Sequence, residues 1–197
     1  MRSTAHYVRH SVYDNPDGIE PGRIPGLHLT APGEKKAEKT VRFFKGKPIV
    51  HIYTSPLERA YETANIIAKA FPKVPITHSY ELTEADSTYW QAYKYEMLFN
   101  NNYYEAFLTD PDAPDLPENL TALAERMKKF ALTICQKHTG QEIICVSHEF
   151  PILALRLSLE EKPLQLLRSY NISMASITSF VFDENCRLVE TSYTEMK

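Results

Sequence analysis

Five side chains suited to handling phosphate follow apolar runs of this sequence. They are Arg9, His10, Arg59, Glu84 and His148. A guanidinium is planar and permanently charged, so it offers donors that match phosphate oxygens, while a histidine can act as donor, base or nucleophile. No metal-ligand spacing relates these residues to one another. The set predicts a phosphoryl-transfer site in which arginines, rather than a metal ion, neutralise the phosphate charge.

Strands and helices alternate along the chain between these residues. Apolar runs predict strands within residues 3–9, 47–54, 75–82 and 141–148, and a final pair around a turn at residues 183–185. Helical spacing of apolar residues predicts helices that begin near residues 31, 56, 120 and 150. This order predicts an α/β fold. We expect a three-layer α/β/α sandwich with a mostly parallel central sheet and the final pair of strands at one edge.

The fold explains how distant residues could meet. In open parallel sheets, ligands bind beyond the carboxyl ends of the strands. Arg9 and His10 come directly after the first predicted strand, Arg59 and Glu84 follow the next two, and His148 ends the fourth. The sequence therefore predicts that these five side chains share one rim of the sheet.

A segment of different composition interrupts the alternation. Residues 85–117 are rich in Tyr, Asn and Asp, and loops of this length in compact domains are usually functional or disordered. We predict one domain over residues 1–197, with this segment as a partly helical cap or lid. The acidic residues near its end are expected to form a solvated loop; they are Asp110, Asp112, Asp115 and Glu118.

The helix that carries Arg59 has a marked start. Ser55 and Glu58 have the spacing of a capping box, with Pro56 at the first helical position. Arg59 then lies in the first turn, where the helix dipole disfavours a cation. A bound phosphate would resolve this conflict, because an anion at a helix N-terminus is favoured by both the dipole and the arginine.

Charge and hydropathy exclude several kinds of partner. The 197 residues carry a net charge of −3, with 43% hydrophobic and 24% charged residues, so no basic surface indicates nucleic acid or an anionic membrane. No apolar run approaches the ~18 residues that a membrane span needs, and the N-terminus lacks the apolar region of a signal peptide. A cytoplasmic protein with a small-molecule ligand is expected. Its oligomeric state stays open.

The cysteines support the same location. Cys135, Cys145 and Cys186 are odd in number and lack CxxC spacing, and two of them lie in apolar runs. This pattern argues against a disulfide framework and against a zinc site, and favours a reducing compartment.

Five segments resemble motifs of the histidine phosphatase superfamily, the phosphoglycerate-mutase-like proteins. In chain order they are "VRHS", "GRIPGLHLTAPGEKKA", "TSPLERAYETA", "LTEADSTYW" and "VSHEFPI". They are similar to that family's nucleophile segment, its first connection, its S-P-L-x-R helix start, its L-x-E segment and its second-histidine segment. The five occur in the family's order and cover most of the chain outside the predicted cap.

The resemblance implies a role for each residue of the rim. His10 would take the phosphoryl group, and Arg9, Arg59 and His148 would hold its oxygens. Glu84 would protonate the leaving oxygen and later activate water. No cofactor and no metal ion are implied.

Three departures from the family's pattern bear on this site. Ser11 replaces the glycine after the nucleophile, and its side chain could crowd the phosphate or donate one more hydrogen bond. Glu149 replaces the glycine after the second histidine; it could face inward and weaken phosphate binding, or face outward on the first turn of its helix. Asn15 corresponds to a phosphate-binding asparagine of the family, with the spacing one residue short.

The predicted function is therefore hydrolysis of a phosphomonoester, a small phosphorylated metabolite, through a covalent phosphohistidine. Three alternatives remain. A phosphoglycerate-type mutase would need an Arg-rich insert, whereas the insert here is acidic and rich in Tyr. A catalytically weak phospholigand-binding or regulatory protein is suggested by Ser11 and Glu149. A phosphoprotein phosphatase is disfavoured, because a large cap narrows access to the site.

Overall fold

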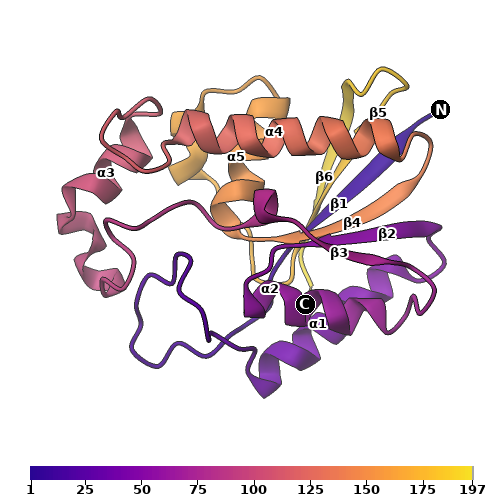
Figure 1. Cartoon of the computed structure of the whole chain (residues 1–197), viewed down its shortest axis with the longest axis horizontal. Helices are drawn as coiled ribbons and strands as arrows, with labels where there is room; N and C mark the ends of the chain where they lie inside the picture. The colour runs from indigo at the N-terminus through magenta and orange to yellow at the C-terminus, as the bar shows by residue number, and fades with distance from the viewer. Residues whose placement is uncertain (197) are drawn as a thin grey trace.

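A six-stranded sheet runs through the molecule in the order β3-β2-β4-β1-β5-β6 (Figure 1). The computed structural model describes residues 1–196, so Lys197, the last residue of the predicted domain, lies outside the described residues. The strands are β1 (Ser3–Arg9), β2 (Ile49–Thr54), β3 (Ile76–His78), β4 (Glu142–Ser147), β5 (Ile177–Phe182) and β6 (Leu188–Thr194). The pairs β1–β4, β4–β2 and β2–β3 are parallel, and β5 is antiparallel to both β1 and β6. The predicted α/β fold with a mostly parallel sheet is confirmed, as is the position of the last two strands.

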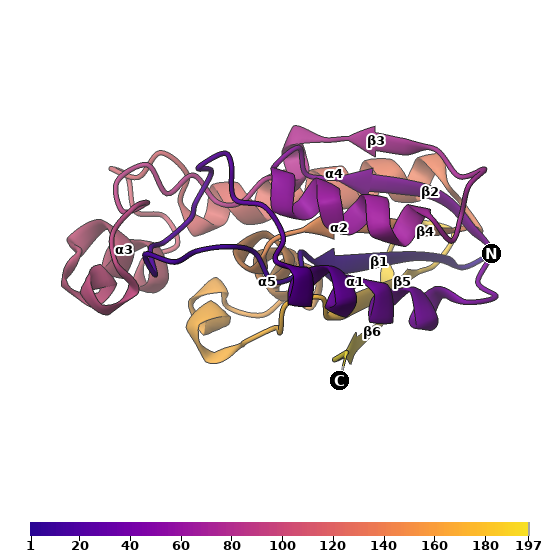
Figure 2. The ribbon, with the colours of Figure 1, turned by 90° about the horizontal axis from the view of Figure 1, so that it is seen from below.

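Helices cover both faces of the sheet (Figure 2). One face packs against α1 (Ala31–Phe44) and α2 (Glu58–Ala68), and the other against α4 (Leu120–Lys137) and α5 (Glu149–Leu159). Successive residues of a strand point to opposite faces, so Val8 joins the core of the first layer and Tyr7 that of the second. Within residues 1–196, none of the helices has the length and apolarity to span a bilayer. The predicted three-layer arrangement is confirmed.

Local capping residues set where most helices begin. Thr30 accepts a hydrogen bond from the Gly33 N–H at 3.1 Å and starts α1, and Asn119 accepts one from the Ala122 N–H at 2.9 Å and starts α4. The capping box predicted at Ser55 is wrong. α2 begins at Glu58, with Leu57 at the N-cap position and no side-chain cap. The Ser55 hydroxyl accepts the Leu57 N–H at 3.3 Å, but the Ser55 N–H donates to the Val146 carbonyl rather than to Glu58.

The predicted cap segment folds at the end of the sheet where β1 finishes (Figure 1). It contains the 3₁₀ helix η2 (Tyr95–Asn100) and the helix α3 (Asn102–Thr109). Trp90 is fully buried and packs against Phe107 with the rings tilted and their centroids 5.2 Å apart. Phe107 in turn lies 5.2 Å from Phe150 of α5. Aromatic packing thus holds the segment against α5.

The loop that follows β1 joins the cap through its backbone. The Glu20 N–H donates to the Tyr93 carbonyl at 2.8 Å, and the Ala92 N–H donates to the Glu20 carbonyl at 2.9 Å. The Tyr95 N–H donates to the Gly18 carbonyl, also at 2.9 Å. These bonds fix the backbone of Glu20 between β1 and the cap.

Two cysteines form a disulfide, contrary to the prediction. Cys135, near the end of α4, is bonded to Cys186 in the turn between β5 and β6, with Cα atoms 6.0 Å apart, while Cys145 on β4 is free and buried. The prediction was wrong because the two partners, 51 residues apart, meet only when α4 packs on the sheet. The cysteines therefore no longer support a reducing compartment.

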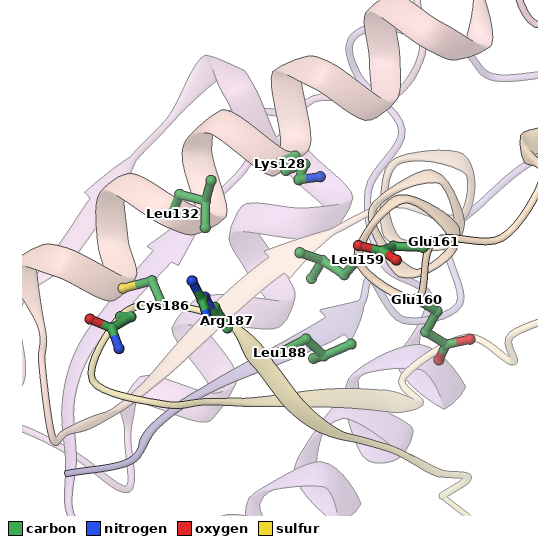
Figure 3. Close-up of a pocket in the computed structure, with 9 residues that line it drawn as sticks. Lys128, Leu132, Leu159, Glu160, Glu161, Cys186, Arg187 and Leu188 are labelled. Carbon is green, nitrogen blue, oxygen red and sulfur yellow. The ribbon is translucent and has the colours of Figure 1, made fainter.

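A hollow of about 690 Å³ borders this disulfide. Figure 3 shows Cys186, Arg187 and Leu188 on the hairpin side of the hollow, facing Lys128 and Leu132 of α4. None of the five rim residues predicted from the sequence lines it.

Candidate active site

The register of the central strands brings the predicted residues together. Arg9 lies opposite Ser147 in the parallel pairing of β1 with β4. The His10 N–H donates to the Ser147 carbonyl at 2.9 Å, and the Ser55 N–H donates to the Val146 carbonyl at 2.9 Å. The residues that follow β1, β2 and β4 are therefore neighbours, as the sequence predicted.

His10 is held with one ring nitrogen available. Its side chain is 3% exposed, and Nδ1 lies 2.9 Å from the Ser11 carbonyl oxygen. A carbonyl can only accept, so Nδ1 carries the proton and Nε2 carries the lone pair of the neutral ring. Burial, with Arg59 and Arg9 nearby, holds the pKa of His10 well below its usual range. His10 is thus neutral at physiological pH, the form that a nucleophile needs.

His148 lies beside His10, but the nitrogen that it leaves available is a proton donor rather than a lone pair. The ring centroids are 5.0 Å apart, and His148 Nε2 lies 2.9 Å from the Ser55 hydroxyl oxygen. That oxygen already accepts the Leu57 N–H at 3.3 Å, so its own proton is free for Nε2. The buried Nδ1 has no partner. In the neutral ring that burial favours, Nδ1 then carries a proton that an anion could accept.

Arg59 presents unpaired donors to the same rim. It is fully buried, and its NH2 donates to the Gly22 carbonyl at 2.7 Å, while Nε and NH1 have no partner. Gly22 has φ of +44°, and a Cβ there would lie 2.1 Å from the Ser87 hydroxyl oxygen, so this carbonyl position requires glycine. Buried guanidinium donors without partners are costly. A bound anion would satisfy them.

Arg9 is engaged by a carboxylate. Its NH1 donates to the Ile172 carbonyl at 2.6 Å, and its NH2 lies 2.9 Å from Glu149 Oε2. Of the two orientations open from the sequence, Glu149 therefore adopts the inward one. Burial raises the pKa of Glu149, and Arg9 opposes this shift.

Glu84 is a buried carboxyl group. It is 6% exposed, and its Oε1 accepts the Ala85 N–H at 2.8 Å. Burial raises its pKa to about 8, with Glu20 and Glu149 adding to the shift and Arg59 opposing it. At neutral pH Glu84 is therefore mostly protonated and can donate a proton.

A network of ion pairs fixes the Glu84 segment. Arg23 Nε donates to the Glu84 carbonyl at 2.8 Å, and Arg23 NH2 lies 3.0 Å from Glu118 Oε2. Arg126 Nε donates to Glu118 Oε1 at 2.7 Å. The prediction of a solvated Glu118 is wrong, because its side chain is 11% exposed and two arginines surround it. Nothing in the sequence marks the contact of Glu118 with Arg23, which lies 95 positions away.

Ser11 and Asn15 have other partners. The Ser11 hydroxyl donates to the Gly33 carbonyl at 2.7 Å, and its N–H donates to Thr63 Oγ1 at 2.9 Å, so its hydroxyl proton is already used by α1. The Asn15 amide closes its own loop on Ile19, through bonds of 2.8 and 3.2 Å. Among the described residues, Asn15 forms no hydrogen bond with His10, Arg9 or Arg59. In residues 1–196, His, Cys, Asp and Glu side chains form no group of three or more that could hold a metal ion.

Comparison with known proteins gives the family. The model of the histidine phosphatase superfamily (branch 1) matches residues 6–194. The chain belongs to the histidine phosphatase superfamily. An uncharacterised protein of Mycobacterium tuberculosis is 31% identical over 209 aligned positions, covering 96% of this chain and 95% of the relative. The family inferred from the five motifs is confirmed.

Two further proteins that are similar to this chain have more descriptive names. Phosphoserine phosphatase 1 of Hydrogenobacter thermophilus is 26% identical over 176 positions, covering 85% of this chain and 82% of the relative. The crystal structure of a phosphoserine phosphatase from Entamoeba histolytica with 3-phosphoglyceric acid matches with a TM-score of 0.86 at 24% identity, over 98% of this chain and 97% of that one. The second likeness shows that the two proteins share a fold.

Proposed function

We propose that this protein hydrolyses the phosphomonoester of a small metabolite through a phosphohistidine at His10. The observation that carries the proposal is the meeting of three complementary groups at one rim. His10 Nε2 offers a lone pair, His148 Nδ1 is a buried donor without a partner, and Arg59 has two more. A nucleophile beside unpaired donors is the arrangement that phosphoryl transfer requires.

The first step transfers the phosphoryl group to the protein. His10 Nε2 attacks phosphorus, the bond from phosphorus to the ester oxygen breaks, and the Glu84 proton passes to that oxygen, so the product leaves as an alcohol. Arg59, His148 and Arg9 bind the phosphoryl oxygens. Because the transition state is loose, catalysis depends mainly on position and on neutralising charge.

The second step releases phosphate. Glu84, now a carboxylate, takes a proton from water as the water oxygen attacks phosphorus. The bond between phosphorus and His10 Nε2 breaks, inorganic phosphate leaves, and Glu84 is protonated again. The cycle consumes one ester and one water molecule. We infer that it needs no metal ion, so activity should persist in EDTA.

Trapping the intermediate tests the proposal. Protein incubated with a ³²P-labelled monoester and quenched in detergent at alkaline pH should carry an acid-labile label that maps to His10, and His10→Ala should lose both label and turnover. The matched control is His78→Ala, since His78 is an exposed histidine on β3. Melting curves show whether each variant folds. A label on another residue, or aryl phosphate turnover equal in wild type and a folded His10→Ala, contradicts the mechanism.

One contact favours a second candidate, a weak enzyme that mainly binds phospholigands. The ion pair of Arg9 with Glu149 occupies a guanidinium that phosphate would otherwise use. This candidate predicts measurable binding of phosphate esters with turnover no faster than in His10→Ala. A mutase would instead interconvert the phosphoglycerates, and a phosphoprotein phosphatase would release phosphate from labelled protein. The hydrolase proposal has the most support, because two relatives bear the name phosphoserine phosphatase.

The proposal includes the cytoplasmic location expected from the sequence.

A further inference from the structure

A second cavity adjoins the phosphate site. It has a volume of about 520 Å³ and lies between the cap, α5 and the 3₁₀ helix η3 (Leu164–Ser169). Aromatic side chains form much of its lining, including Tyr95, Phe99 and Tyr104 of the cap. Glu149, the carboxylate that pairs with Arg9, lines it as well. A group attached to a phosphate held by Arg9 would therefore enter this cavity.

The cavity also contains a carboxylate that lacks a cation. Glu20 is 8% exposed, and its Oε1 has only a long hydrogen bond of 3.4 Å from the Gly22 N–H. Among the described residues, Glu20 forms no ion pair, whereas Glu149 has Arg9. Burying an unpaired carboxylate is expensive. The backbone bonds of Glu20 to the cap keep it in this position.

The position of Glu20 is unfavourable for binding a phosphate that carries no positive group. Burial raises the pKa of Glu20, Arg59 and Arg9 oppose this shift, and Glu149 adds to it. Glu20 therefore lies within electrostatic range of the phosphate site. In its charged form, a carboxylate within this range repels a phosphate dianion. The repulsion is relieved if the same ligand brings a positive charge to Glu20.

The aromatic lining fits a cation as well. Tyrosine rings attract an ammonium group by about 0.5–2 kcal/mol when it lies over their faces. Arg168, the cation that shares this cavity, is half exposed and faces Glu105 at 3.6 Å, so it does not neutralise Glu20. A leaving group with a carboxylate could instead pair with Arg168, so the test includes a substrate of that kind.

We propose that the substrate is the phosphate ester of an amino alcohol, whose protonated amine binds Glu20 in the aromatic cavity while its phosphate binds at His10. The proposal rests on the proposed function, and it adds the chemical class of the leaving group. Glu20 acts here in recognition and takes no part in the proton transfers of Glu84.

The test compares four leaving groups of different charge on the wild-type protein. O-phosphoethanolamine carries an amine, propyl phosphate is its neutral analogue, 3-phosphoglycerate carries a carboxylate, and O-phosphoserine carries both. We expect kcat/KM for O-phosphoethanolamine to exceed that for propyl phosphate about 10- to 100-fold, the range of one charge-assisted hydrogen bond. O-phosphoserine should also exceed propyl phosphate. A ratio near one, or a preference for 3-phosphoglycerate over both amines, overturns the proposal.

Variants assign the preference to Glu20. In Glu20→Gln the ratio of O-phosphoethanolamine to propyl phosphate should fall to near one. In Glu96→Gln, the same change at an exposed cap position outside the cavity lining, the ratio should be unchanged. An amine preference that persists in a folded Glu20→Gln would overturn the assignment.

A separate measurement distinguishes failure of this proposal from failure of the proposed function. Hydrolysis of p-nitrophenyl phosphate by wild type without an amine preference would refute the amino-alcohol proposal alone. If no ester is hydrolysed, the proposed function fails, and the amine proposal is tested by thermal shift. O-phosphoethanolamine should then raise Tm more than propyl phosphate does, and an equal rise refutes it.

Discussion

Replacing Glu84 by Gln should change the pH dependence of both activity and stability. Gln keeps an oxygen that can accept the Ala85 N–H, but it can neither give nor take a proton. With an alkyl phosphate, we expect wild-type kcat/KM to fall above pH about 8, where Glu84 loses its proton. Glu84→Gln should lose this limb and be slower by about 100-fold or more at neutral pH. With p-nitrophenyl phosphate, whose phenolate leaves without a proton, the loss should be much smaller.

The Glu84 proton also makes the stability of the fold depend on pH. Glu84 keeps its proton in the folded state up to pH about 8, from a usual value of 4.5. Between these values the unfolded chain releases a proton that the folded chain retains, so the free energy of unfolding falls as pH rises. The difference corresponds to about 5 kcal/mol once Glu84 is charged in the fold. Glu84→Gln avoids this cost, so its Tm relative to wild type should rise by about 10–20 °C between pH 5 and pH 9.

The measurement is a series of melting curves for both proteins across that pH range, together with pH–rate profiles. Glu81→Gln is the matched control, because Glu81 lies on the same segment and is exposed, and a hydrogen bond from Ser79 lowers its pKa. Its Tm relative to wild type should not rise at high pH. If Glu84→Gln behaves like Glu81→Gln, or keeps the wild-type limb near pH 8, then Glu84 is not the buried acid described above.

Three other changes test separate parts of the structure. Ser55→Ala removes the hydroxyl proton that sets the His148 tautomer, and kcat/KM should fall about 10-fold, whereas Ser55→Thr should retain most activity. Glu149→Gln frees Arg9, so inorganic phosphate, which has no leaving group, should inhibit about 5-fold more tightly; weaker inhibition would contradict the inferred competition. Dithiothreitol should lower wild-type stability by about 4 kcal/mol, as expected for a 51-residue separation, but leave Cys186→Ser unaffected. Equal responses in denaturant titrations would argue against the disulfide.

The rim of the sheet was predictable because its residues obey local rules. Strand ends in a parallel sheet meet at one edge, so Arg9, His10 and His148 could be placed together from their positions after apolar runs. The sheet order places β1, β4 and β2 side by side, which is what that inference needed. The helix starts near residues 31 and 120 were predictable for a similar reason, since a cap such as Thr30 or Asn119 depends only on the next three residues.

Contacts between distant loops were not predictable in this way. Cys186 lies in a hairpin turn, and only the packing of α4 brings Cys135 to it. Glu118 was expected to be solvated because its neighbours in sequence are acidic, yet its partners come from the loop after β1 and from α4. Glu20 follows no strand and matches no motif. Its importance depends on burial beside the phosphate site, which no local pattern reports.

The three carboxylates around this phosphate site differ in how their charge is balanced. Glu149 has Arg9, Glu84 has its own proton up to pH about 8, and Glu20 has neither a cation nor a strong hydrogen bond among the described residues. A dianion can bind beside three such groups only if their combined negative charge is reduced. Protonation of Glu84 achieves part of this and also prepares the leaving group, so phosphate binding and proton donation should weaken together as pH rises. Glu20 has no cation of its own in the fold, and burial raises its pKa, so its charged form needs a positive partner, which we assign to the substrate.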